Sequence, residues 1–212
     1  MQHVLCFGDS LTWGHCPATS GRLAFEDRWP NVLAAGLENA HVIAEGLRGR
    51  STCRDNDAMP CDMNGARVLP MLLHSHAPLD LVVIMLGTND IYQGYRPDQV
   101  AAGLRRLVEI VQTHRQSRHV AWAQPDVLLV APPPLVAGAD PVVSGPLIAA
   151  SRRLARMTEM AAMDMGVDWV DMREVAQASE LDSVHLDAQN TRAIGMALIA
   201  PVARLLAARA HP

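Results

Sequence analysis

The feature that most constrains the fold of this 212-residue chain is an apolar run that ends on a glycine. Residues 4–7, Val-Leu-Cys-Phe, lead directly into Gly8, Asp9 and Ser10. A buried strand that ends on a glycine and delivers a serine into the next turn is typical of α/β enzymes that expose a nucleophile. We therefore expect Ser10 to attack an ester. The rest of the chain must then supply a base, an acid that orients it, and donors for an oxyanion.

Apolar runs and amphipathic stretches alternate along the whole chain, without repeats or a linker. Strands are predicted at 3–7, 41–44, 79–86, 127–131 and 167–171, and helices at 29–37, 65–75, 97–112, 147–165 and 190–209. This alternation predicts an α/β fold: a three-layer α/β/α sandwich with a central parallel sheet of about five strands. The length favours a single domain over residues 1–212. In such sheets the ligand site lies beyond the carboxyl ends of the strands.

Several connecting segments carry more specific expectations. Asn64 is placed to cap the helix over 65–75, in which Pro70 sets a kink or a late start. A polar insertion covers 113–125 and contains Trp122. The apolar loop 132–148 is either a pocket rim or a subunit contact, so a homo-oligomer is one of the expectations.

Composition excludes several classes of function. The net charge is −4 at pH 7, which gives no general basic surface for nucleic acid. The sequence contains no lysine, so Schiff-base and Ser-Lys mechanisms are excluded. The first predicted strand begins within a few residues of Met1, so we expect no signal peptide. No apolar run approaches the length of a membrane span. The cysteines lack the spacing of zinc ligands. We expect a cytoplasmic protein with reduced thiols that binds neither nucleic acid nor a membrane.

Two further motifs become informative only together with the serine. Gly87-Thr88-Asn89-Asp90 follows the strand at 79–86, and Asp182-Ser183-Val184-His185 lies just before the last helix. Taken alone, each has an ordinary explanation: a capped turn, or a loop carboxylate with a surface histidine. A long polar loop, 45–64, adds Gly46 and Gly49 after the second strand. The segments that follow strands all fall on one edge of a parallel sheet.

In this order the motifs resemble the GDSL or SGNH hydrolase family over the whole chain. The resemblance implies a flavodoxin-like SGNH hydrolase fold with Ser10 as nucleophile, His185 as general base and Asp182 as the carboxylate that fixes the imidazole tautomer. It implies no cofactor and no metal. Asp9 is expected to be structural, because its side chain can bond the backbone of the turn.

The resemblance also implies an oxyanion hole. Its donors would be the Ser10 N–H, the Gly49 N–H and the side-chain amide of Asn89, with Gly46 competing for the place of Gly49. We expect Trp13, Thr88 and Leu186 to line the substrate pocket. For Trp13 the alternative is core packing beneath the loop.

Within the family, several stretches resemble the bacterial arylesterase and acyltransferase (perhydrolase) branch: 6–14, 45–47, 50–52, 79–82, 85–90 and 132–135. That branch favours short acyl groups, and some members transfer acyl groups to alcohols or peroxide. The predicted activity is hydrolysis of small-molecule aryl or alkyl esters through an acyl-enzyme. The alternatives are a xylan or sugar acetyl esterase, a thioesterase or a lysophospholipase. A non-catalytic flavodoxin-like binding module is a different class, in which Asp182 and His185 have no role.

Overall fold

A five-stranded parallel sheet lies at the centre of the computed structural model, which describes residues 1–115 and 123–210. Its strands are β1 (Gln2–Gly8), β2 (Ala40–Gly46), β3 (Leu81–Met85), β4 (Asp126–Ala131) and β5 (Asp168–Asp171). They are ordered β2-β1-β3-β4-β5, and every neighbouring pair is parallel. The predicted α/β fold and strand number are confirmed.

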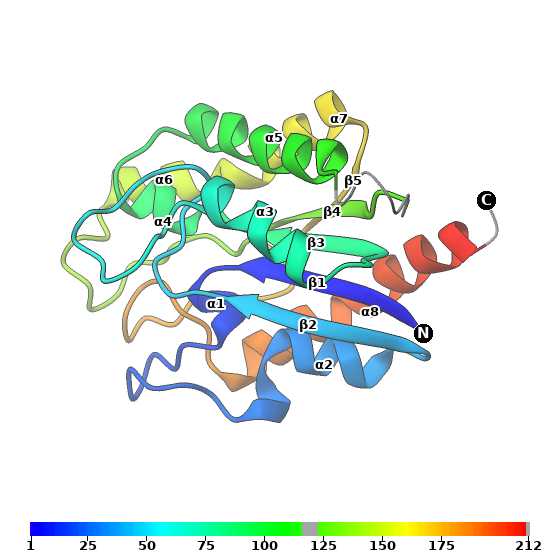
Figure 1. The fold of residues 1–212 in the computed structure, drawn as a ribbon. Coiled ribbons are helices and arrows are strands. Elements are labelled where there is room, and N and C mark those ends of the chain that lie inside the picture. Colours follow the sequence, from blue (N-terminus) through cyan, green and yellow to red (C-terminus); the bar gives the residue numbers. More distant parts are fainter. Residues whose placement is uncertain (116–122, 211–212) are drawn as a thin grey trace.

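Helices cover both faces of this sheet. The helices are α1 (Ser10–Trp13), α2 (Trp29–Gly36), α3 (Gly65–Ser75), α4 (Thr88–Tyr92), α5 (Pro97–Thr113), α6 (Gly145–Arg152), α7 (Leu154–Met165) and α8 (Ala188–Ala210), with a short 3₁₀ helix η1 (Phe25–Asp27). In Figure 1, α3, α5 and α7 lie above the sheet, and α2 and α8 lie below it. The arrangement is the predicted three-layer sandwich.

β3 and the inner parts of β1 and β4 are apolar because each face of the sheet has its own core. Along β1, Leu5 and Phe7 belong to the cluster under α3 and α5, whereas Val4 and Cys6 belong to the cluster over α2 and α8. Side chains alternate between the two faces of a strand, so a strand covered on both sides needs apolar residues at every position. The same requirement explains the unbroken apolar sequence of β3.

The long helix α8 is an exception to the expectation that no apolar run approaches a membrane span. By length and composition alone, Ala188–Arg209 could cross a membrane. However, Ile194, Leu198 and Val202 are fully buried in the core shared with α2, and Pro201 lies inside the helix. The spacing of these residues places one apolar stripe against the sheet, as expected for a core helix.

Two expectations about local structure are wrong, two short helices were not foreseen, and one expectation is not tested. The helix expected over 147–165 is two helices, because the chain tightens at Arg153, whose N–H bonds the Ala150 carbonyl three residues back. Asn64 precedes α3 but does not cap it with its side chain, which donates to Asp55 instead. The short helices α1 and α4 were not predicted. Most of the predicted polar insertion, including Trp122, lies outside the described residues.

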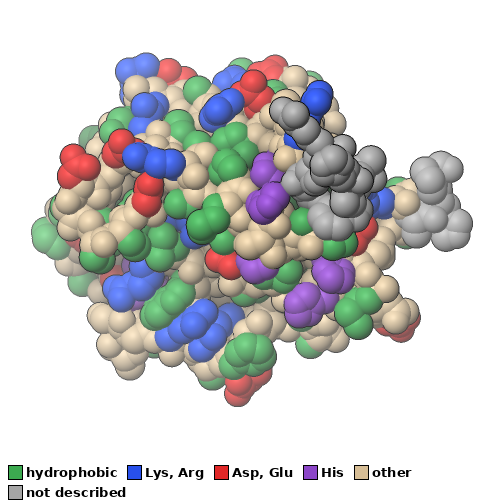
Figure 2. Space-filling model, in the orientation of Figure 1, with side chains coloured by type: hydrophobic (Ala, Val, Ile, Leu, Met, Phe, Trp, Pro, Cys, Tyr) green, Lys and Arg blue, Asp and Glu red, His purple; other side chains and the backbone are tan. Residues whose placement is uncertain are grey.

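The loop at 132–148 is buried at its start, whereas most of residues 137–146 are exposed. Leu135 and Val143 are buried in the core, whereas Val142 is half exposed. Figure 2 shows hydrophobic side chains between acidic and basic ones on the face in view. Whether the loop also contacts a second copy of the chain stays a prediction.

Register brings the carboxyl ends of three strands level with one another. Gly8 at the end of β1 pairs with Gly46 of β2 and with Met85 of β3. The segments that follow these strands therefore start side by side, at the left in Figure 1. Together with the loop between β5 and α8, they form the edge at which a ligand site is expected.

Candidate active site

Ser10 lies at the first position of α1, directly after β1. Asp9 caps this helix, since its Oδ1 accepts a hydrogen bond of 2.9 Å from the Leu11 N–H. Ser10 is 5% exposed. The structural role expected for the Asp9 side chain in the turn is confirmed, and the cap fixes the direction in which the serine leaves the strand.

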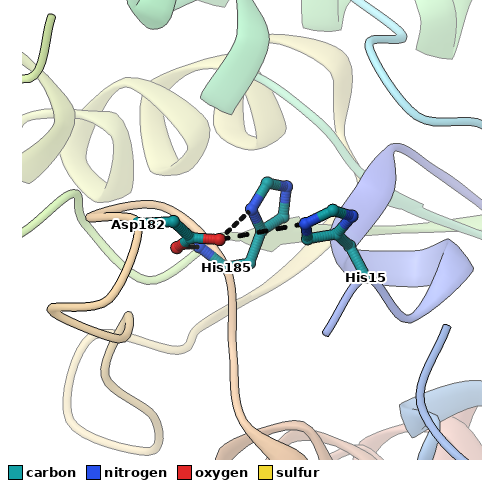
Figure 3. Close-up of side chains that lie close together, drawn as sticks. All are labelled: His15, Asp182 and His185. Atoms are coloured by element: carbon teal, nitrogen blue, oxygen red, sulfur yellow. Dashed lines mark hydrogen bonds and ion pairs between the residues drawn. The ribbon is translucent and has the colours of Figure 1, made fainter. Parts of the chain in front are cut away.

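His185 and Asp182 come from the loop before α8 and meet Ser10 in space. His185 Nε2 lies 2.9 Å from Ser10 Oγ, and His185 Nδ1 lies 2.7 Å from Asp182 Oδ2. The other carboxylate oxygen of Asp182 accepts the backbone N–H groups of His185, at 2.9 Å, and of Val184, at 3.1 Å. Ser183 adopts a positive φ of 65°, which turns the chain so that Asp182 faces His185 (Figure 3).

Burial sets the protonation of this pair. It lowers the pKa of His185 below 6.5; the hydrogen bond and charge of Asp182 counteract part of this effect, whereas Arg48 adds to it. Burial by itself would raise the pKa of Asp182, but hydrogen bonds from His185 and Val184 outweigh it and hold the pKa below its usual range. At neutral pH the imidazole is therefore neutral and the carboxylate ionised, which are the states that a general base and its orienting group require.

The three proposed oxyanion donors belong to Ser10, Gly49 and Asn89, which line one cavity. Within the described ranges, neither the Ser10 N–H nor the Gly49 N–H is bonded to another group. The Asn89 side-chain amide donates to the Arg50 carbonyl at 3.0 Å and to Asp9 Oδ2 at 3.2 Å. An oxyanion would therefore compete with Asp9 for one of its hydrogens.

Buried polar contacts fix the loop that carries Gly49. Asp90 in α4 accepts hydrogen bonds from the Thr52 hydroxyl, at 2.6 Å, and from the Thr52 N–H, at 2.9 Å. Arg50, 4% exposed, donates to the Gly8 carbonyl at 2.9 Å and lies over the Phe7 ring at 4.3 Å. These contacts hold the loop against β1 and α4.

The two candidate glycines differ in what they face. Gly49 has a φ of +86° and lines a cavity beside Ser10. A Cβ at Gly46 would lie 2.2 Å from the Trp13 backbone nitrogen, so this glycine permits close packing of β2 against α1. The geometry favours Gly49 as the oxyanion donor.

Two cavities open beside His185. The first, of about 470 Å³, is lined by Ser10, Leu47, Arg48, Gly49, Met59, Pro60, Cys61, Met63, Asn89 and His185. The second, of about 310 Å³, is lined by His15, Ser20, Arg48, Asn89, Tyr92, Asp140, Asp182, Val184 and His185. A cavity with several apolar side chains and one lined mostly by polar side chains therefore meet at the serine–histidine pair.

The expected pocket residues Trp13, Thr88 and Leu186 line neither of these two cavities, and whether they contact substrate stays a prediction. The Trp13 ring is flanked by the guanidinium groups of Arg22, at 4.8 Å, and Arg48, at 5.4 Å. Leu186 is 2% exposed and belongs to the core against α8. Thr88 is buried at the start of α4.

His15 was missed, because the sequence shows no partner for it. Its ring centroid lies 3.9 Å from that of His185, and its Nε2 lies 3.9 Å from Asp182 Oδ2. Among the described residues, His15, Asp182 and His185 bring potential metal-ligating atoms within 4.8 Å of one another. All four cysteines are free. The only available signal was the position of His15, five residues after the serine.

Comparison with known proteins points to one group of enzymes. A model described as "GDSL-like Lipase/Acylhydrolase family" matches residues 6–198. A curated arylesterase of Vibrio mimicus is 30% identical over 115 residues, which are 52% of this chain; the match spans 49% of that protein's length.

Solved structures match over nearly the whole chain. A carbohydrate acetylesterase family member from Sinorhizobium meliloti is 44% identical, with a TM-score of 0.93 over 98% of this chain and 100% of that one. A putative arylesterase from Agrobacterium tumefaciens is 48% identical, with a TM-score of 0.90 over 97% and 100%. The M. smegmatis aryl esterase is 38% identical, with the same TM-score and the same coverage.

Proposed function

The chain belongs to the GDSL-like lipase/acylhydrolase family, and from this premise we propose that it hydrolyses short-chain aryl or alkyl esters through an acyl-enzyme. The observation that carries this proposal is the unbroken series of hydrogen bonds from Ser10 through His185 to Asp182. Nucleophile, base and orienting carboxylate are already within bonding distance of one another, and nothing must move to connect them.

In the proposed reaction His185 moves one proton twice. As Ser10 Oγ attacks the ester carbonyl carbon, His185 Nε2 takes the hydroxyl proton, and Asp182 stabilises the imidazolium that forms. The proton then passes to the leaving alkoxide oxygen, which departs as an alcohol and leaves the acyl group on Ser10. Water attacks this ester in the same way, with His185 as base, and Ser10 recovers its proton.

The negative charge that develops on the carbonyl oxygen would be held by fixed dipoles. The Ser10 and Gly49 N–H groups are free to donate, and the Asn89 amide supplies the third hydrogen when its longer bond to Asp9 yields. Burial raises the pKa of Asp9 to about 7, partly offset by the Leu11 N–H and Arg50. Near neutral pH its carboxyl is therefore a weaker competitor for the Asn89 hydrogen than an ordinary carboxylate.

The proposed acyl site is the cavity of about 470 Å³. Leu47, Met59, Pro60 and Met63 give it apolar walls next to Ser10 and the oxyanion donors. We expect kcat/KM for a series of 4-nitrophenyl esters to be highest for short acyl chains and to fall by octanoate. A maximum at octanoate would contradict a short-chain site.

Ser10→Ala tests the proposed nucleophile. Hydrolysis of phenyl acetate should fall by several orders of magnitude, because a serine hydrolase without its nucleophile can lose on the order of 10⁶-fold in kcat. The circular dichroism spectrum should not change. Ser75→Ala, at the far end of α3, is the matched control and should keep full activity. Undiminished hydrolysis by the Ser10 variant would refute the assignment.

A sugar or xylan acetyl ester is the second candidate substrate. It is favoured by the similarity to the S. meliloti carbohydrate acetylesterase family member and by the second cavity, where Ser20, Tyr92 and Asp140 offer polar groups to a sugar alcohol. The test compares kcat/KM for acetylated xylo-oligosaccharides and phenyl acetate. If Asp140→Asn lowers only the former, the sugar lies in this cavity; equal loss on both would exclude a sugar-specific role.

Acyl transfer and self-association remain part of the proposal through the resemblance to the perhydrolase branch. Transfer is tested by adding an alcohol to the ester in water and measuring the new ester formed. A sizing column tests self-association.

A further inference from the structure

His15 places a second imidazole beside the proposed catalytic pair. The side chain is 7% exposed, and its Nε2 points toward the same Asp182 oxygen that accepts His185 Nδ1 (Figure 3). The other ring nitrogen, Nδ1, is buried and has no hydrogen-bond partner in the part of the chain that the structure describes. The proposed hydrolysis gives this residue no role.

Backbone hydrogen bonds within the loop after α1 fix the position of His15. Its N–H donates to the Ser10 carbonyl at 3.0 Å, and it forms a bridge with Arg22. Leu23 N–H donates to the Gly14 carbonyl at 2.8 Å. The loop after α1 is therefore folded back on itself, which holds the imidazole next to His185.

The chemistry of these side chains suits a cation. Each histidine offers a ring nitrogen, and Asp182 offers a carboxylate oxygen. Two neutral imidazoles and one carboxylate are a ligand set that Zn²⁺ and Cu²⁺ prefer.

We propose that His15, Asp182 and His185 form an inhibitory binding site for a divalent transition-metal ion such as Zn²⁺. The three ligating atoms lie within 4.8 Å of one another, so small side-chain movements close them around one ion. The cavity of about 310 Å³ is lined by all three residues and gives the ion a path from solvent. Asp140 lines the same cavity and adds negative charge to that path.

Inhibition, which rests on the proposed catalytic role of His185, follows from the tautomer. In the free protein the hydrogen of the His185 ring lies on Nδ1. When a metal binds Nδ1, this hydrogen moves to Nε2 and the metal takes the lone pair that is exposed on Nδ1. The imidazole stays neutral, and no redox change occurs. The ring then carries its hydrogen on Nε2 and cannot accept the proton of Ser10. Metal binding and ester hydrolysis therefore exclude each other.

Arg48 lines the cavity of the proposed metal site, where its positive charge should weaken the binding of a cation. It lines both cavities, and its positive charge lowers the pKa of both histidines. Since a like charge nearby weakens cation binding, Arg48→Gln should tighten Zn²⁺ binding. Loss of a ligand from His15 acts in the opposite direction.

Calorimetric titration of ZnCl₂ into the Ser10→Ala protein tests binding without any need for activity. We expect one site, at least about tenfold weaker in Ser10→Ala/His15→Phe, since even outer-shell changes cost metal sites about that much. His41→Phe, at an exposed histidine, is the control in the same background. The proposal is overturned if no Zn²⁺ binds or if both histidine variants weaken binding equally. His15→Gln replaces His15→Phe if the latter does not fold.

Inhibition of the chain with Ser10 intact completes the test. ZnCl₂ should suppress phenyl acetate hydrolysis, EDTA should restore it, and His15→Phe should raise the half-inhibitory concentration at least about tenfold. Site-specific binding without inhibition would refute the inhibitory role. If the chain hydrolyses no ester, the proposed function fails, whereas calorimetry still decides whether the metal site exists.

Discussion

The protonation of His185 should set the acid limit of activity. Only the neutral imidazole can accept the Ser10 proton, and burial lowers its pKa below 6.5. Activity therefore increases as the pH rises through this pKa, and the midpoint of the acid limb should lie below pH 6.5. The measurement is kcat/KM for phenyl acetate against pH. A limb centred above pH 6.5 would mean that burial does not dominate at this site.

Removing the charge of Arg48 should move that limb to higher pH. Arg48 lowers the pKa of His185, so in Arg48→Gln the imidazole becomes protonated at a higher pH than in the parent. Arg204→Gln, whose side chain pairs with Asp168 at 2.7 Å, removes the same charge elsewhere and should leave the midpoint unchanged. A shift of equal size in both variants would reflect net charge and not the local contact.

The Asn89 amide should act in the transition state more than in substrate binding. Its hydrogens point to the Arg50 carbonyl and Asp9 in the free protein, and an oxyanion would recruit one of them. Asn89→Ala should lower kcat by about 10²–10³-fold, the usual cost of one lost oxyanion donor, with KM changed only a few-fold. Gln93→Ala in the next turn is the control. A loss that falls mainly on KM would contradict the assignment.

Residues differ in how far the sequence could place them. Ser10 and Asn89 stand in short motifs directly after predicted strands, so topology alone puts their segments at one edge, whereas His185 was placed by the resemblance of its motif. His15 and Asp182 are 167 positions apart, and only the folded loop after α1 brings them within 3.9 Å. Trp13 was expected in the substrate pocket because it follows the nucleophile turn. Its ring lies between the guanidinium groups of Arg22 and Arg48.

The number of residues in a helix or strand decided whether the sequence could predict it. The strands and the helices α5 and α8 have enough residues for an apolar period, whereas α1 and α4 have four and five residues and show none. The break between α6 and α7 was missed for a different reason. Ser151 accepts from the Leu135 N–H and donates to the Ile148 carbonyl, a tertiary contact that periodicity does not reveal.

The contact between β2 and α1 predicts a cost for a methyl group at Gly46. A Cβ there meets the Trp13 backbone, which cannot swing away as a side chain would, so β2 or α1 must shift. Gly46→Ala should destabilise the protein by about 1–3 kcal/mol. That corresponds to roughly 2–4 °C in Tm for each kcal/mol, and activity should also fall because α1 carries Ser10. Gly145→Ala, where a Cβ meets nothing within 4 Å, should leave Tm nearly unchanged.

On the scale of the whole molecule, the site depends on both halves of the chain. Ser10 follows β1, whereas His185 precedes α8, and the sheet order places β1 between β2 and β3. The alternating pattern predicted a parallel sheet, but strand order depends on which helices pack together across the faces. A site assembled from distant segments exists only while both helix layers remain packed on the sheet.

Unfolding should therefore abolish activity and secondary structure together, if residues 1–212 form the single domain that we propose. Leu198 is fully buried in α8, and Leu198→Ala should destabilise the protein by about 2–5 kcal/mol. Met196 in the same helix is 63% exposed, and the stability of Met196→Ala should stay within about 0.5 kcal/mol of the parent.

In urea, the loss of ester hydrolysis and the loss of the circular dichroism signal should share one midpoint, and Leu198→Ala should lower both midpoints equally. If activity disappeared at lower urea while the helical signal persisted, the edge that carries Ser10 and His185 would unfold separately, and α8 would not be part of one cooperative core.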